Sequence, residues 1–192
     1  MSKRISVPMG ILVLLVGGLV TFTGTSNLPP YSYAQESSSS AALPQLGPYD
    51  TYFVTQTSLG TPFQTDSGRI AMRKGGTEAI RSYADLMVSS HIAVNDALEV
   101  ILKRKVRTPP PTLLKAAYTT ILSTLDTDEG QKFDADYVSG QVKYQKANAL
   151  LYYHEIGNGK DPDLKAFAEQ TLPKILDHLE RALKLEQELK VP

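Results

Sequence analysis

Two histidines in this 192-residue sequence are the side chains best placed for metal binding or proton transfer. His91 and His178 each lie on a stripe of apolar residues spaced alternately by four and three, which is typical of the buried face of a helix in a bundle. The spacing therefore predicts that both imidazoles are buried and close together. The third histidine, His154, falls near the end of a predicted helix, where a cation interacts favourably with the helix dipole.

A transition-metal site is one interpretation of the histidine pair, and it requires further ligands. A di-iron site in a four-helix bundle takes carboxylates from all four helices and two Glu-x-x-His motifs, but the sequence contains no such motif. The acids that could complete a site are Asp134 and Asp177, so the metal candidates are His91, His178 and Asp134. The remaining inward polar residues are amides, which are poor ligands beside carboxylates: Gln64, Gln145 and Asn148.

A structural role is the other main interpretation of the two histidines, and it is the one that we favour. Buried imidazoles are disfavoured in the charged form, so we expect neutral rings that hydrogen-bond to Gln145, Asn148 or a tyrosine hydroxyl. On this interpretation the protein has no cofactor and no metal. Proton transfer by the pair is a third interpretation.

Other catalytic chemistry finds little support in the residues. The absence of cysteine excludes disulfides, thiolate nucleophiles and cysteine-ligated metals. Ser89 and Ser90 precede His91, but neighbours along a helix point away from each other. Gly75 and Gly76 precede a predicted helix without the lysine of a phosphate-binding loop. We therefore predict no catalytic residue and a protein that is more consistent with a non-enzyme.

The elements that must position the histidines are predicted to be helices, because helical spacing dominates from Asp50 onward. Four long helices with a short third helix between the two pairs predict two antiparallel hairpins joined by a crossover. This is an all-α, ferritin-like antiparallel four-helix bundle over residues 49–192. The predicted ranges are Asp50–Met72, Thr77–Val106, Thr112–Leu125, Gly130–Ile156, and Asp161 or Asp163 to Leu189. Pro62 and Pro173 lie inside two of these helices and are expected to bend them.

The first 48 residues predict export followed by a tether. Lys3 and Arg4 precede an apolar stretch over residues 7–22, and Ser32-Tyr33-Ala34 fits a cleavage site, so residues 1–34 are predicted to be a signal peptide. The alternative is an uncleaved membrane anchor over residues 5–23. Residues 35–48 are rich in Ser, Ala and Pro and are expected to form a disordered linker. Both alternatives predict an extracytoplasmic domain, whether secreted, periplasmic or at the cell surface.

Three separated motifs occur in order along the chain: the segment 81–91 with Asn95 and Leu98, the segment 133–137 with Gln141 and Val142, and the segment 172–178. Together they resemble one family of exported bacterial and archaeal proteins, domain-of-unknown-function family 4142. The resemblance covers about residues 50–185 and implies a ferritin-like four-helix fold and an extracytoplasmic location, but no established reaction. The sequence departs from the family pattern at Gln64 and Ser90, where acids are usual, and at Gln145, where histidine is usual.

Two functions remain open on this evidence. The favoured one is a non-enzymatic helical bundle that binds an unknown protein or small molecule, or protects against stress, at the cell surface. The alternative is a ferritin-like metal-binding or redox protein that uses His91 and His178. A formal net charge of zero argues against nucleic acid as a partner. Membrane contact is expected only through an uncleaved N-terminal segment.

Overall fold

A computed structural model describes residues 46–105 and 116–190 of the chain, which form five helices and no strand. The helices lie within one unit, Ser38–Pro192. They are α1 (Pro48–Lys74), α2 (Glu78–Leu102), α3 (Ala116–Thr127), α4 (Gly130–Asn158) and α5 (Pro162–Lys190). The all-α prediction is confirmed for the described residues.

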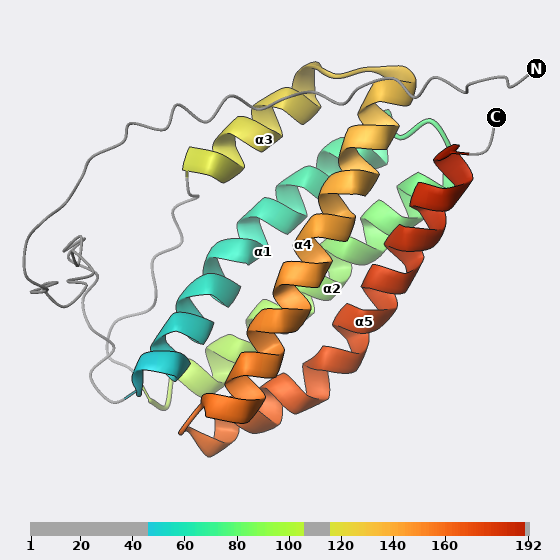
Figure 1. Cartoon of the computed structure of the whole chain (residues 1–192). Helices are drawn as coiled ribbons and strands as arrows, with labels where there is room; N and C mark the ends of the chain where they lie inside the picture. The colour runs from blue at the N-terminus through green and yellow to red at the C-terminus, as the bar shows by residue number, and fades with distance from the viewer. Residues whose placement is uncertain (1–45, 106–115, 191–192) are drawn as a thin grey trace, which may run out of the picture. The chain divides into compact units, whose positions relative to one another are not determined.

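The four long helices form two hairpins that pack against each other (Figure 1). α1 packs against α2 and α4 packs against α5, while α1 also contacts α4 and α2 also contacts α5. The short α3 contacts α1 and, less extensively, α4. Each long helix thus lies beside two antiparallel neighbours, which is the predicted antiparallel bundle with a short crossover helix.

Capping residues fix two of the helix starts. The Thr77 hydroxyl accepts a hydrogen bond from the Ile80 backbone N–H at the start of α2. Asp161 Oδ1 accepts from the N–H groups of Asp163 and Leu164, so Asp161 is the residue that caps α5.

The helix ends differ slightly from the predicted bounds. α2 ends at Leu102 rather than Val106, and α4 extends to Asn158. α1 and α5 continue through Pro62 and Pro173, respectively. Each proline removes one backbone donor without ending its helix, because packing of the apolar face stabilises the remaining turns.

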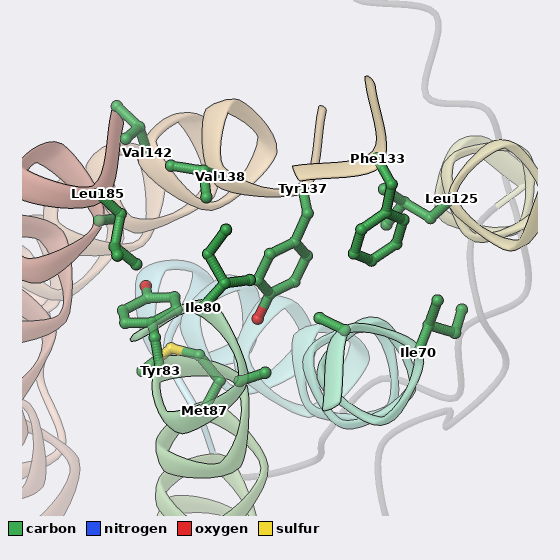
Figure 2. Packing of buried hydrophobic residues seen from close by; sticks show 13 residues of the cluster. Ile70, Ile80, Tyr83, Met87, Leu125, Phe133, Tyr137, Val138, Val142 and Leu185 are labelled. Carbon is green, nitrogen blue, oxygen red and sulfur yellow. The ribbon is translucent and has the colours of Figure 1, made fainter. Parts of the chain in front are cut away.

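Apolar side chains form two clusters, one toward each end of the bundle. The first gathers at the α1–α2 turn and includes Tyr83, Phe133 and Tyr137 (Figure 2). The second gathers toward the α4–α5 turn and includes Phe53 and Tyr152, whose rings meet edge to face at 4.9 Å. Burial of these faces supplies most of the stability of the helices. Between the two clusters, each long helix also buries polar side chains, although α1 buries Leu59 and Phe63 in the same stretch.

A glycine allows α1 and α2 to approach closely. A Cβ atom added to Gly68 would lie 2.6 Å from Val88 Cγ2 and 3.1 Å from the carbonyl oxygen of Ala84. One of these contacts is to backbone, so a side chain at position 68 could be accommodated only by moving the helices apart.

Two carboxylates fasten the turns of one hairpin to a helix of the other. Asp134 of α4 accepts a hydrogen bond of 2.9 Å from the Gly76 N–H in the α1–α2 turn. Asp50 of α1 accepts hydrogen bonds of 2.9 Å from the N–H groups of Lys160 and Asp161 in the α4–α5 turn. These bonds satisfy backbone donors that the turns would otherwise leave unpaired.

The residues before position 46 lie outside the described part of the chain, so the signal peptide, the anchor over residues 5–23 and the linker over residues 35–45 stay predictions. Pro48, which was assigned to the end of the linker, is instead the first residue of α1. Among the helices that the structure does describe, none has the length and apolar character needed to cross a membrane.

Substitution of two glycines tests the close approach of α1 and α2. Gly68→Ala should destabilise the protein by about 1–3 kcal/mol, because the new methyl group overpacks the contact with α2. Gly140→Ala in α4 is the matched control: no atom lies within 4 Å of its added Cβ, so it should stabilise the protein by about 0.5–1 kcal/mol. Urea unfolding followed by circular dichroism measures both, and equal stabilisation by the two alanines would contradict the close packing.

Candidate functional site

His91 and His178 lie side by side in the middle of the bundle, as the spacing predicted. They come from the neighbouring helices α2 and α5, and are 6% and 5% exposed. Their ring centroids are 6.3 Å apart and the ring planes are inclined by 39°. This separation leaves room for one small atom or molecule between the two imidazoles.

The two rings belong to a layer of buried polar side chains that separates the two apolar clusters. Every long helix contributes to this layer, which also contains Thr57, Gln64, Gln145, Asn148 and Thr171. The amides that were predicted to face inward, Gln64, Gln145 and Asn148, are therefore buried. None of these additional side chains carries a formal charge, so the layer is polar but neutral if the histidines are neutral.

A cavity of about 10 Å³ lies within this layer, lined by both histidines together with Tyr144, Asn148 and Thr171. Its volume is close to the minimum for one water molecule, and its walls carry enough polar atoms to hold one. His91 Nε2 and His178 Nδ1 are buried and find no hydrogen-bond partner among the described protein atoms. A water in the cavity is the simplest way to satisfy such nitrogens.

Burial keeps both imidazoles neutral. Desolvation, and secondarily the neighbouring His178, lowers the pKa of His91 to about 3. Desolvation also lowers the pKa of His178 to about 4, although the adjacent Asp177 carboxylate opposes this shift. With such pKa values neither ring is an effective general base near neutral pH, because proton transfer is most efficient when the pKa lies near the working pH.

Tyr144 and Gly60 form part of the site that sequence reasoning did not assemble. The Tyr144 ring meets the His91 ring edge-on with centroids 6.0 Å apart. Its hydroxyl fits against Gly60 of α1, where an added Cβ would lie 2.1 Å from the hydroxyl oxygen. The sequence did not single out either residue, because periodicity gives no signal for a pairing between residues of two helices.

The hydrogen-bond partner predicted for the histidines is wrong in one case. The Gln145 side chain donates to Met87 Sδ at 3.4 Å and to Gln141 Oε1 at 3.5 Å, and it does not line the cavity. Asn148 does line the cavity, as expected for a residue that could share a water with the histidines.

The acidic candidates lie away from the two imidazoles. Asp134 is bound to the α1–α2 turn through Gly76, about 20 Å along α2 from His91. Asp177 precedes His178 but points to solvent, where it forms an ion pair of 2.8 Å with Arg181. His154 is exposed near the end of α4.

The donor set does not match the carboxylate-rich site of a di-iron bundle. Within residues 46–105 and 116–190, no group of three or more His, Asp or Glu side chains is arranged to hold a metal ion. What the site offers a metal is two neutral imidazole nitrogens, and any further ligand would be an amide, a hydroxyl or water.

An open groove between α2 and α5 reaches the site from outside. It is lined by Ser90, Pro173, Lys174 and His178, among others. Ser90, Lys174 and His178 also line the internal cavity, so the groove and the cavity share part of their walls.

Residues 35–185 match the model of a protein family described as "Domain of unknown function (DUF4142)". The chain belongs to this family. The resemblance of the three motifs is thereby confirmed, and the DUF4142 match covers all five helices up to Leu185 of α5. None of the curated proteins matches the chain.

A solved structure gives an independent comparison for the DUF4142 fold. The crystal structure of a DUF305 fragment from Deinococcus radiodurans is similar with a TM-score of 0.66 at 12% sequence identity, over 76% of this chain and 99% of that chain. At this identity the likeness concerns the fold alone.

Acidification tests the neutral state of the histidine pair. Folding lowers both pKa values below the ordinary value of 6.5, so the unfolded chain binds more protons and stability falls as the pH drops from about 6.5 toward 4. His91→Gln removes one of these groups. The free energy of unfolding of the wild type relative to this variant should therefore decrease over that range.

The exposed His154 supplies the control for this experiment. His154→Gln should leave the difference from the wild type constant between pH 6.5 and pH 4. Urea unfolding at several pH values gives both comparisons, and a His91→Gln difference that is also independent of pH would contradict a buried, neutral ring.

Proposed function

We propose that this protein is an exported, ferritin-like helical bundle that acts by binding at the cell exterior and not by catalysis, with His91 and His178 as structural parts of its core. The observation that carries the proposal is the size of the cavity beside the two rings. The cavity of about 10 Å³ holds one water but no organic molecule, so no organic substrate fits beside the two rings inside the bundle, whereas small-molecule sites usually span several hundred Å³.

The electrostatics of the site support the same proposal. The imidazole pKa values of about 3 and about 4 make weak bases, and burial raises the pKa of the Tyr144 hydroxyl well above its usual value. A tyrosine of this kind neither ionises nor transfers a proton easily near neutral pH. The groups around the cavity therefore favour a stable neutral layer over acid–base chemistry.

Binding would then take place on the outer faces of the helices. Large apolar side chains are exposed near the start of α1 and the end of α4, including Tyr49, Tyr52, Leu150 and Tyr153, each more than half exposed. Tyrosine is enriched at protein interfaces because it combines apolar area with a polar tip. These residues are a starting point for identifying the unknown protein or small-molecule partner.

Export is supported by the order of features at the start of the sequence, from Lys3 and Arg4 to Ala34. Mass spectrometry of the protein isolated from its native host should detect a chain that begins at Gln35. A full-length chain in the membrane fraction would instead favour the anchor over residues 5–23, and a full-length cytoplasmic chain would contradict export.

A metal-binding or redox role is the second candidate, favoured by the two unpaired nitrogens. His91 Nε2 and His178 Nδ1 are donors of the kind that zinc and copper ions prefer, and they belong to rings 6.3 Å apart. Such an ion would occupy the cavity in which a water is expected if the histidines are only structural. Tyr144 and Asn148 would lie beside the ion.

Elemental analysis separates the two candidates. Protein purified from the native host without a histidine tag should contain far less than one metal ion per chain, and a chelator should leave its helical content and Tm unchanged. Near-stoichiometric zinc, copper, iron or manganese that is lost in His91→Gln and retained in His154→Gln would overturn the first candidate in favour of the second. If the wild type, His91→Gln and His154→Gln all retain the metal, the ion is bound away from His91. This result would contradict only the expectation that the protein contains no metal.

A further inference from the structure

Asp50 occupies a position at the start of α1 where its carboxylate is fully enclosed. It is 0% exposed, and its two oxygens accept three backbone hydrogen bonds. Oδ1 accepts from Lys160 and Asp161 at 2.9 Å each, and Oδ2 accepts from Gly47 at 3.0 Å. Three N–H donors directed at one carboxyl group favour its ionised form. Asp50 thus acts as the negative charge that holds the α4–α5 turn against α1.

Glu155 is a second buried carboxyl group beside it, at the end of α4. It is 1% exposed, and neither of its oxygens receives a hydrogen bond from a donor in the described protein. Gly159 packs directly against the Glu155 carboxyl group, since an added Cβ at this glycine would lie 2.5 Å from Glu155 Oε1. A carboxylate in this position would be an unpaired charge with little contact with water, which is strongly unfavourable.

The two carboxyl groups satisfy each other if only one of them is ionised. Asp50 can accept a further bond but has no proton to give, because its N–H partners favour the carboxylate. Glu155 has no donor to accept from, so its only favourable arrangement is a protonated carboxyl that donates to Asp50. This is the shared-proton arrangement of paired acids, in which like charges at short range cannot both be present.

We propose that Glu155 keeps its proton at neutral pH and donates it to Asp50, and that loss of this proton releases the α4–α5 turn from the start of α1. The pair is thus a latch that alkaline conditions open. Because the latch joins the first helix of one hairpin to the turn of the other, its opening loosens this end of the bundle and leaves the histidine layer in place.

The charges around the pair agree with this assignment. Burial, followed by the hydrogen bond to Asp50 and the charges of Asp50 and Asp161, raises the pKa of Glu155 to about 8, and Lys165 of α5 only partly opposes this. Burial opposes ionisation of Asp50 as well, but the N–H groups of Asp161 and Lys160 outweigh it and the pKa of Asp50 is lowered.

The remaining charges near the latch are already paired or point to solvent. Lys105, which follows α2, forms ion pairs of 2.8 Å with Asp161 and 2.9 Å with Asp163, so it does not neutralise Glu155. The Lys160 and His154 side chains are exposed.

The sign of the pH dependence follows from the raised pKa. The unfolded chain loses the Glu155 proton near pH 4.5 and the folded chain near pH 8, so the folded state binds more protons between these values. The contribution of Glu155 to stability is therefore complete below about pH 4.5 and declines as the pH rises toward 8. A histidine with a lowered pKa contributes to stability with the opposite pH dependence, because its contribution increases as the pH rises.

Glu155→Gln tests the latch, because glutamine can donate the same hydrogen bond to Asp50 without titrating. We expect the wild-type Tm to fall relative to this variant as the pH rises from 5 to 9, by about 5 °C or more. Glu169→Gln, at an exposed position on α5, is the matched control and should show no pH-dependent difference from the wild type. A difference between the wild type and Glu155→Gln that is constant from pH 5 to pH 9 would overturn the proposal.

Limited trypsin digestion reports on the turn itself. Cleavage after Lys160 and Lys165 should accelerate in the wild type relative to Glu155→Gln by about tenfold between pH 7 and pH 9, because the ionised fraction of Glu155 rises by about that factor. The ratio to the variant removes the pH dependence of trypsin. Equal rates at both pH values would contradict an opening of the turn.

The wild-type protein alone supplies a further test if Glu155→Gln fails to fold. A carbon-13 NMR titration of the glutamate side-chain carboxyl groups should contain one signal with a midpoint near pH 8 in addition to those of exposed glutamates. A titration in which every glutamate has its midpoint below pH 6 would overturn the proposal.

Discussion

The requirement that a buried polar layer carry no net charge governs the middle of this bundle. His91 and His178 lie beside a space large enough for one water, and two imidazolium ions at this separation would repel each other in a medium that screens poorly. Neutral rings avoid this repulsion, but their buried nitrogens then need hydrogen-bond partners. The other polar side chains of the layer are amides and hydroxyls, which carry no charge.

The layer also fixes the register of the helices, because a shift of one turn would place these polar groups against an apolar cluster. Buried polar groups in helical assemblies are known to specify register in this way.

The ends of the bundle are fixed by a different device, the buried carboxyl group directed at a turn. Asp134 reaches from α4 to the α1–α2 turn, and Asp50 reaches from α1 to the α4–α5 turn, so each hairpin holds the loop of the other. The two connections differ in one respect. Asp134 acts without a second buried acid among its described contacts, whereas Asp50 has Glu155 beside it and the pair must share a proton. The second acid therefore makes the connection at the α4–α5 turn dependent on the protonation state of Glu155.

The periodicity of the sequence predicted the features that depend on a single helix. It failed to predict which residues of different helices are in contact. The helices, their inward faces and the burial of His91 and His178 follow from spacing, because a side chain that breaks the apolar phase of its helix would face solvent. Spacing does not report which inward residues of different helices meet. Gln145 was one of the partners expected for the histidines but bonds to Met87 and Gln141, while Tyr144, which was not singled out among the tyrosines, lines the cavity. Glu155 was missed entirely, because a glutamate near a helix end resembles an exposed residue until the turn that buries it is known.

The histidine layer and the carboxyl latch respond to pH with opposite signs, and their ranges overlap. Between about pH 4.5 and 6.5, raising the pH removes protons that only the unfolded chain binds at the two histidines, which favours the folded state. Over the same range it weakens the contribution of Glu155, which retains its proton only in the folded state. Two groups outweigh one, so the sum of these three contributions increases up to about pH 6. Above about pH 6.5 the histidine contribution is constant and that of Glu155 continues to decline toward pH 8. Of these three contributions, the histidine pair therefore limits stability on the acidic side, and Glu155 limits it on the alkaline side.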